Sequence, residues 1–451
     1  MVSDFFWPNM GGVEGHVYDL SQRLAARGHR VTIVTHRYND RVGVRYLSSF
    51  VKVYYIPTWL VFDQVTWPTV YGLFPILRQI MIREHVDIVH GHQAFSAMCH
   101  EAILHARTMG LRTCFTDHSL FGFADTGSIL TNKLLKFTLS DVDGVICVSH
   151  TSKENTVLRA AIEPDRVSVI PNAIIAANFT PDWSHNPPDH VPHGIAIIVV
   201  SRLVYRKGID LLVSLLPRIC QLFPDVNFII AGDGPKLIEL EQVREKYILQ
   251  DRIQLLGSVN HGAVRSVLVR GQIFLNCSLT EAFCIAMVEA ASCGLLVVST
   301  SVGGVPEVLP DGILMLSRPD EDDLVRQISR AIHLVSTNGV DRTTFHERVK
   351  DMYSWGDVAA RTETVYAQIL DRPPSGLAHR LVLFYGCGLL AGKIAVLIMA
   401  FDYLVLTLLN WIHPSEGIDR APPFVHTYSP LAQREDVTDS ATVDSDSRPL
   451  T

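Results

Sequence analysis

Residues 195–208 read Ile-Ala-Ile-Ile-Val-Val-Ser-Arg-Leu-Val-Tyr-Arg-Lys-Gly, an apolar run that ends in a basic loop. A short β-branched run of this kind predicts a buried strand, because strands enclosed on both faces read as continuous apolar segments. Amphipathic stretches separate similar runs on both sides of it. Such alternation of strand and helix predicts parallel, doubly wound α/β sheets.

The same pattern predicts strands in both halves of the chain. They are expected at 30–35, 51–56, 86–90, 112–115, 144–148 and 167–170, and then at 195–200, 226–231, 253–256, 273–276 and 295–299. The stretch 181–194 holds four prolines and interrupts the alternation. We interpret it as a linker between two Rossmann-like domains, one over 1–180 and one over 195–375.

Composition excludes several classes of protein. The chain has 451 residues, 48% of them hydrophobic, which suits two or three domains with large cores. Its 39 Lys and Arg stand against 46 Asp and Glu, so it lacks the basic excess of a nucleic-acid binder. The eight cysteines include no Cys-x-x-Cys pair, which argues against a zinc site or a compact disulfide framework and favours a cytosol-facing protein.

A late apolar stretch predicts a membrane span. Residues 381–412 are interrupted only by the charges of Lys393 and Asp402, and about 20 apolar residues cross a bilayer. Three arginines lie in the twenty residues before the stretch and one in the twenty after it. That bias predicts that the N-terminal part faces the cytosol and the tail lies across the membrane. The acidic tail, 413–451, is expected to be disordered.

Features inside this stretch predict helix partners. Gly388 and Gly392 form a Gly-x-x-x-Gly step, which lets another helix approach closely. Lys393 and Asp402 are nine residues apart, on opposite sides of a helix, and cannot pair with each other. Because a lone charge in a bilayer is costly, we expect a partner subunit, or a position near the headgroups for Lys393.

Several motifs point to a ligand at the carboxyl ends of the strands, where doubly wound sheets bind ligands. Glycines before a helix let N–H groups close on an anion, and an Arg with a Lys can neutralise a diphosphate. Taken singly, each motif is also compatible with a tight turn or a solvated loop. The motifs are Gly11-Gly12-Val-Glu-Gly15, Ser201 to Gly208 with Arg202 and Lys207, and Gly232-Asp-Gly-Pro235.

Two carboxylates form the remaining motif. Glu281 and Glu289 are eight residues apart in mostly apolar surroundings. On one helix they would lie roughly 80° apart, so both could edge one cleft, with Glu281 at the helix N-terminus. Two surface acids on a solvated helix would be the alternative, and the apolar neighbours fit it poorly.

These motifs together resemble those of retaining GT-B glycosyltransferases that use nucleotide sugars. Longer strings are similar to the catalytic subunits of the phosphatidylinositol N-acetylglucosaminyltransferases of GPI-anchor assembly. The resemblance covers the chain up to about residue 420 and implies two facing Rossmann-like domains, the first binding the acceptor, plus one C-terminal transmembrane helix. The strings that carry it include 4–14, 115–125, 151–161, 201–210, 278–284 and 302–308.

The resemblance also implies roles for individual residues. Arg202 and Lys207 would hold the UDP diphosphate, with Gly11 and Gly12 closing on it from the other domain. Glu281 would contact the donor sugar, Glu289 the ribose, and His118 would lie against the sugar. From its own loop, Thr-Asp-His-Ser, His118 is equally compatible with plain loop hydrogen bonding.

The implied reaction moves N-acetylglucosamine from UDP-GlcNAc to phosphatidylinositol with retention of anomeric configuration. No cofactor or metal is expected, because the donor loops hold no compact Asp-x-Asp or His/Cys cluster and already offer two cations. Other membrane subunits in the endoplasmic reticulum membrane are implied as partners, and nucleic acid is not.

Alternative functions remain open from the sequence. A related transferase could use another sugar or lipid, since the donor motifs are shared across the superfamily. A nucleotide-binding dehydrogenase is disfavoured by the missing Gly-x-Gly-x-x-Gly motif. A silent scaffold subunit would not need all four charged residues of the donor motifs.

An aromatic stretch over 59–74 also has two interpretations. Trp59 and Trp67 could contact a membrane interface, where Trp is enriched, or could pack in a core.

Overall fold

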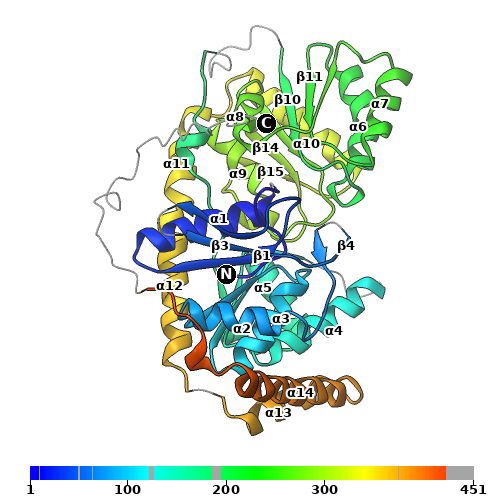
Figure 1. The fold of residues 1–451 in the computed structure, drawn as a ribbon. Helices are drawn as coiled ribbons and strands as arrows, with labels where there is room; N and C mark the ends of the chain where they lie inside the picture. The colour runs from blue at the N-terminus through cyan, green and yellow to red at the C-terminus, as the bar shows by residue number, and fades with distance from the viewer. Residues whose placement is uncertain are drawn as a thin grey trace, which may run out of the picture.

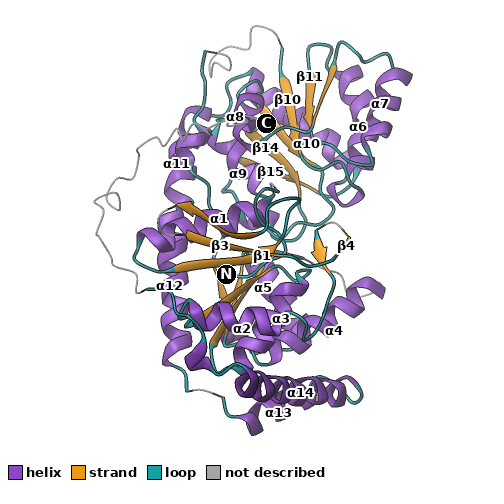
Figure 2. Cartoon of the chain, viewed as in Figure 1, coloured by secondary structure: helices purple, strands orange, loops and turns teal. Residues whose placement is uncertain are grey.

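The computed structural model describes residues 1–9, 11–48, 51–62, 64–120, 126–184, 194–373 and 375–422. Two α/β units lie one above the other, each a sheet flanked by helices (Figures 1 and 2). Most of the expected linker and residues 423–451 of the expected tail lie outside these ranges.

The N-terminal sheet is mostly parallel. Val2 bridges its two parts, pairing with Val34 on one side and Gly91 on the other. Only β2 runs antiparallel, on the outer edge beside β3. In spatial order the strands are β2 (Gly43–Ser48), β3 (Val51–Ile56), β1 (Val31–His36), β6 (Ile88–His92), β7 (Arg112–Asp117), β8 (Gly144–Cys147) and β9 (Val167–Val169).

The C-terminal sheet is wholly parallel, and most residues of its central strands are buried because helices cover both faces. This confirms the predicted α/β class with parallel sheets. In spatial order the strands are β12 (Ile253–Gly257), β11 (Asn227–Ala231), β10 (Ala196–Val200), β13 (Ile273–Asn276), β14 (Leu296–Thr300) and β15 (Leu314–Ser317).

Every strand expected from the sequence is present, with ends that differ by at most two residues. The sequence did not predict β2, β15 or a small hairpin, β4 (Leu60–Phe62) with β5 (Val65–Thr66). All of them are edge or surface strands; β2 mixes polar with apolar residues, β4 and β5 have only three and two residues, and β15 has a short apolar run that the sequence analysis did not assign. In the hairpin segment Trp59 is 83% exposed and Trp67 58% exposed, so neither tryptophan packs in a core.

Helices connect the strands as a doubly wound fold requires. The N-terminal unit has α1 (Gly12–Ala26), α2 (Phe74–Arg83), α3 (Ala97–Thr108), α4 (Thr126–Ser140) and α5 (His150–Ala160). The C-terminal unit has α6 (Ile209–Leu222), α7 (Leu237–Lys246), α8 (His261–Leu268), α9 (Ile285–Ser292), α10 (Glu321–Ser336) and α11 (Phe345–Met352).

The helix α12 (Trp355–Asp371) returns to the N-terminal unit, alongside α1 and β7 (Figure 1). Its Tyr366 hydroxyl lies 2.7 Å from His90 Nδ1, and Ile369 covers Gly144 at the start of β8. The predicted C-terminal domain, 195–375, includes this helix, whereas the helix packs against the N-terminal unit. The other domain limits stay a prediction.

The late apolar stretch is two helices, α13 (Leu377–Tyr385) and α14 (Ala391–Ile412). The turn between them includes Gly388 at φ +136°, a backbone conformation that suits glycine. An added Cβ on Gly392 would lie 2.1 Å from the Tyr385 carbonyl oxygen. For Gly392, the close helix partner is therefore α13 of the same chain, whereas Gly388 serves the turn.

Asp402 corrects another expectation. Its carboxylate lies 2.8 Å from Nδ1 of His105 on α3, and both side chains are fully buried. The charge predicted to need a partner subunit is therefore matched inside the chain. Lys393 is exposed.

Asp4 ties the N-terminal loop to two elements beneath it. Its carboxylate accepts hydrogen bonds from the backbone N–H of Thr66 (3.1 Å) and of Ala97 (3.0 Å), the first residue of α3. Burial raises the pKa of Asp4 from 3.8 to about 7, although these hydrogen bonds oppose the shift. The neutral acid is the form that burial favours.

We expect Asp4→Asn to flatten the dependence of stability on pH. Folded Asp4 keeps its proton to a higher pH than unfolded Asp4, so its contribution is full below about pH 4 and is lost as the pH rises through about 7. The thermal unfolding midpoint of the purified chain in detergent should therefore fall less over this range in Asp4→Asn. Asp251→Asn, at an exposed position, is the control. An equal fall of the unfolding midpoint with pH in all three proteins would contradict the raised pKa of Asp4.

Candidate functional site

The two sheets point their carboxyl ends at each other, and the first turn of α1 meets the start of α9 there (Figure 1). A Cβ added to Gly12 would lie 3.7 Å from Cδ1 of Ile285. Beside this point, Glu307 accepts hydrogen bonds from the N–H groups of His150 (2.6 Å) and Thr151 (2.8 Å) at the start of α5. These contacts mark the line along which the two units meet, and Gly12, one of the residues predicted to bind a donor, lies on it.

Lys207 and Glu281 form an ion pair at this line. The loop after β10 reaches the end of β13 because Gly208 has φ +67°, and a Cβ there would lie 1.8 Å from the Cys277 carbonyl oxygen. Glu281 also accepts a hydrogen bond from the Ser278 hydroxyl at 2.9 Å. Two of the predicted donor residues are thus brought into direct contact.

Arg202 lies on the same loop as Lys207, and its side chain is exposed. The backbone around it is held by the next strand end, since Leu203 N–H donates to the Asp233 carbonyl at 2.8 Å. Within the described residues, the guanidinium of Arg202 makes no ion pair or hydrogen bond. The backbone of Arg202 is therefore held in place while its guanidinium is unpaired, on the same loop as Lys207. Such a cation suits an anionic ligand.

Glu289 and Glu281 do not share a helix. The helix α9 begins at Ile285, after Cys284 in the left-handed region (φ 73°), so Glu281 lies in the loop before it. The predicted placement of Glu281 at a helix N-terminus is therefore wrong. Glu289 lies within α9 and is buried, 3.0 Å from Nε2 of His261, and that hydrogen bond raises the pKa of His261.

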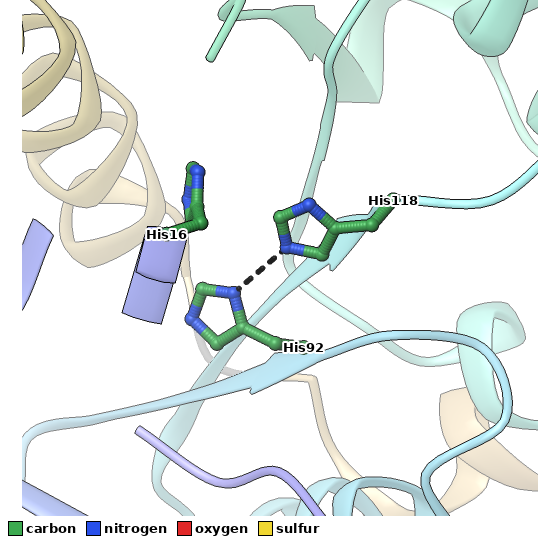
Figure 3. A group of neighbouring side chains, drawn as sticks. All are labelled: His16, His92 and His118. Carbon is green, nitrogen blue, oxygen red and sulfur yellow. Dashed lines mark hydrogen bonds between the residues drawn. The ribbon is translucent and has the colours of Figure 1, made fainter. Parts of the chain in front are cut away.

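His118 lies in a cluster of three histidines at the carboxyl ends of β6 and β7 and the start of α1 (Figure 3). Its Nε2 is 3.3 Å from Nδ1 of His92, and its ring meets that of His16 edge-on at 4.6 Å between centroids. Burial lowers the pKa of His16 to about 4 and those of His92 and His118 well below the usual value. All three rings are therefore neutral at pH 7.

The cluster has the ligand chemistry of a transition-metal site. One ligand nitrogen from each ring lies within 4.8 Å of the others, and His16 Nδ1 is bonded to the Asn172 side chain at 2.8 Å. Neutral imidazoles oriented by a second hydrogen bond are the usual ligands of Zn²⁺. The His92–His118 hydrogen bond uses one nitrogen of each of these two rings without an ion, whereas Nε2 of His92 is buried and has no hydrogen-bond partner among the described residues.

Sequence reasoning missed His16, His92 and His261. His16 follows the Gly11-to-Gly15 motif directly, and His92 ends a strand. A polar residue at either position is a signal, because such positions face the ligand edge of a doubly wound sheet. His261 carried no signal, since only the fold brings α8 beside Glu289.

Family models match both halves of the chain. A model described as PIGA (GPI anchor biosynthesis) matches residues 36–125, and one described as glycosyl transferases group 1 matches 185–339. Sucrose-phosphate synthase from Thermosynechococcus elongatus is similar in structure, with a TM-score of 0.66 and 21% identity, over 80% of this chain and 94% of that one. A glycosyltransferase from Rickettsia africae has a TM-score of 0.64 and 19% sequence identity, over 82% of this chain and 98% of that one. The fold and the strand-end site define a GT-B glycosyltransferase.

Relatives with high sequence identity identify the family within this class of glycosyltransferases. The phosphatidylinositol N-acetylglucosaminyltransferase gpi3 subunit of Schizosaccharomyces pombe is 59% identical over 93% of this chain and 91% of its own length. The subunit of the same transferase from Arabidopsis thaliana is 56% identical over 94% and 93%, and the one from Homo sapiens is 54% identical over 93% and 86%. The chain belongs to this family, the GPI3 subunits of phosphatidylinositol N-acetylglucosaminyltransferase.

We expect Gly303→Ala to weaken donor binding by at least tenfold. Gly303 has φ +53°, and a Cβ there would lie 2.1 Å from the Glu281 carbonyl oxygen and 2.6 Å from the Leu120 side chain. The substitution must therefore shift the backbone at Glu281, which moves a carboxylate that is expected to contact the donor sugar. Titration calorimetry with UDP-N-acetylglucosamine, the donor expected from the sequence, measures the loss. Gly262→Ala is the control, because its Cβ would have nothing within 4 Å, and equal affinity for this donor in both variants would contradict this role of Gly303.

Proposed function

We propose that the chain transfers N-acetylglucosamine from UDP-GlcNAc to phosphatidylinositol with retention, the first step of GPI-anchor biosynthesis. The relatives at 54–59% identity are named for N-acetylglucosamine transfer to phosphatidylinositol. The observation that carries the proposal to this chain is the contact of Lys207 with Glu281 beside Arg202, opposite the first turn of α1.

The donor diphosphate would lie between Arg202 and Lys207. Lys207 is neutralised by Glu281 before binding, whereas the diphosphate brings two negative charges to it. Gly11 and Gly12 open α1 without side chains of their own, so the N–H groups of its first turn could approach the diphosphate from the other domain if the Glu14 carboxylate, which lies beside Gly11, moved aside. This site balances its charge with protein cations, which is why we propose that the donor needs no metal.

Glu289 and Glu281 would hold the two ends of the donor. The buried Glu289 carboxylate, oriented by His261, is suited to accept hydrogen bonds from ribose hydroxyls. When Lys207 pairs with the diphosphate instead of Glu281, the Glu281 carboxylate keeps the hydrogen bond that the Ser278 hydroxyl donates. It can then also accept hydrogen bonds from sugar hydroxyls. The two carboxylates thereby fix the donor along its length.

Transfer would proceed on one face of the sugar. The bond from the anomeric carbon to the diphosphate breaks as the inositol hydroxyl attacks from the same side, which retains the configuration. Negative charge grows on the leaving UDP, and cations held in place before the reaction stabilise it. His118, neutral and held by His92, can exchange hydrogen bonds with the sugar at the cleft without adding a charge.

Partners and location follow from the same relatives. They are named as subunits, so we propose that this chain works with other membrane subunits. Its one helix, within the described residues, that is long and apolar enough to cross a membrane is α14. We propose association with the endoplasmic reticulum membrane with both catalytic domains in the cytosol, where UDP-GlcNAc would be bound.

The test uses microsomes from cells that lack their own catalytic subunit, supplied with this chain and labelled UDP-GlcNAc. Label is expected in a phosphatidylinositol-linked lipid. Arg202→Ala and Glu281→Gln should each lower its rate of formation roughly a hundredfold, because each removes a group aimed at the donor.

Arg218→Ala at equal expression is the control for this assay. Arg218 pairs with Glu321 and Asp322 on the surface of the C-terminal unit, so its loss should leave the rate unchanged. Absence of label with the folded chain and its partner subunits present would contradict the assignment of N-acetylglucosamine. Label from a different nucleotide sugar, supplied in a parallel assay, would then identify the donor instead.

A further inference from the structure

A basic pocket lies at the amino-terminal edge of the N-terminal sheet. Arg112 begins β7, Asp143 directly precedes β8, and Arg166 directly precedes β9. The carboxyl ends of the same strands face the other unit, where β7 ends at Asp117 beside His118 of the candidate site. The six residues of β7 separate the two edges by roughly 17 Å, at ~3.3 Å per residue. The basic pocket is therefore separate from the candidate site between the units.

We call this hollow the arginine pocket. Its volume is about 220 Å³, which is below the roughly 300 Å³ at which sites for whole small molecules begin. A space of this size suits one charged group rather than a nucleotide. The side chains that line the pocket include Arg107, Asp141, Asp143, Arg166, Arg372 and His379.

Positive charge is in excess around the arginine pocket. Arg107 pairs with both aspartates, at 2.8 Å from Asp143 and 3.3 Å from Asp141. Each of these carboxylates also pairs with a second arginine. Arg112 lies 3.8 Å from Asp143, and the buried Arg380 of α13 pairs with Asp141. Two carboxylates therefore already serve three guanidinium groups.

Two further arginines of the pocket add charge without a carboxylate partner. Within the described residues, Arg166 and Arg372 make no ion pair, and their side chains donate to the backbone carbonyls of Val142 and Asp143. Burial lowers the pKa of Arg166, and the charge of Arg372 lowers it further, whereas the two aspartates and the exposed Glu163 act in the opposite direction. A bound anion would balance the charge that remains.

Hydrogen-bond donors are also left without acceptors. Nε of Arg107, Nη1 of Arg112 and Nη2 of Arg380 are buried and have no hydrogen-bond partner among the described residues. Arg107, which lines the pocket, is only 6% exposed. A buried N–H without an acceptor is costly, and guanidinium groups bind phosphate oxygens two at a time. The residues of the pocket therefore have the chemistry of a phosphate site.

The wall of the arginine pocket leads toward the apolar end of the chain. His379 and Leu383 of α13 line it, and α13 is followed by α14, which is long and apolar enough to cross a membrane. Val382, beside Leu383, is 70% exposed. Figure 1 shows α13 at the end of the N-terminal unit that lies away from the C-terminal unit. Arginines close before an apolar span are typical contacts of anionic lipid headgroups.

We propose that the arginine pocket binds a phosphate group and that an anionic lipid headgroup supplies it. Free phosphate has the same chemistry, but a lipid also brings acyl chains, for which the exposed apolar surface of α13 beside the pocket is a partner. The site lies at the opposite edge of the sheet from the candidate active site, so it takes no part in sugar transfer. The proposal holds whichever sugar the enzyme transfers.

The first test measures lipid binding by the purified full chain in a neutral detergent. Phosphatidic acid, whose headgroup is a bare phosphate, is the probe, phosphatidylcholine is the comparison, and native mass spectrometry counts the lipids retained. The native chain should prefer phosphatidic acid, and Arg166→Gln should weaken its binding about tenfold by removing a charge-assisted contact. Arg218→Gln, at the surface of the C-terminal unit, is the matched control and should bind phosphatidic acid as the native chain does.

A second variant keeps the test decisive if Arg166→Gln does not fold. His379 is exposed and lines the pocket, so His379→Glu adds a negative charge there without removing a packed side chain. It should keep the native thermal unfolding midpoint and weaken the binding of phosphatidic acid about tenfold, because like charges repel. His333→Glu, at an exposed histidine of α10, is its control. Unchanged binding in His379→Glu, or no preference of the native chain for phosphatidic acid over phosphatidylcholine, would overturn the proposal.

Inorganic phosphate separates the two sources of the phosphate group. Titration calorimetry should show that it binds the native chain at least roughly tenfold more weakly than phosphatidic acid does, because it buries no apolar surface. If inorganic phosphate binds as tightly as the lipid, and His379→Glu weakens both equally, lipid is overturned as the source. None of these outcomes depends on transferase activity.

Discussion

Parallel strands bring their carboxyl ends to a single edge, and every part of this enzyme's site depends on that constraint. The loop after β10 carries Arg202 and Lys207, and the loop after β13 carries Glu281. Strands β10 and β13 are hydrogen-bonded neighbours, so Lys207 and Glu281 meet although more than seventy residues separate them in the chain. The close approach of Gly208 to the Cys277 carbonyl sets the distance at which they meet.

Charge differs between the two units at their line of contact. The donor side keeps Arg202 free and Lys207 only singly paired, ready for an anion. The facing side presents three imidazoles, of which His16 and His92 are buried and His118 is half-buried, and burial lowers the pKa of each ring, so all three rings are neutral. An anionic donor would therefore be attracted to the donor side, while these rings offer hydrogen bonds without adding charge.

The C-terminal helices are joined to the domain by buried polar contacts rather than by apolar packing alone. His105 with Asp402 and Arg380 with Asp141 would each leave an uncompensated charge if the helices detached. These pairs fix the angle at which the apolar surface of α14 meets the domain. The position of α14 on the N-terminal unit is thus set by a few specific contacts.

Local pattern in the sequence determined the buried strands, the apolar character of 391–412 and the charged residues of the donor loops, because each depends on residues a few positions apart. The tertiary structure alone decided three things. It placed Glu281 in a loop outside α9, it gathered His16, His92 and His118 from three elements, and it paired Asp402 with a histidine 297 residues away. Such contacts depend on how distant segments pack, and the spacing of residues along the chain carries no record of that.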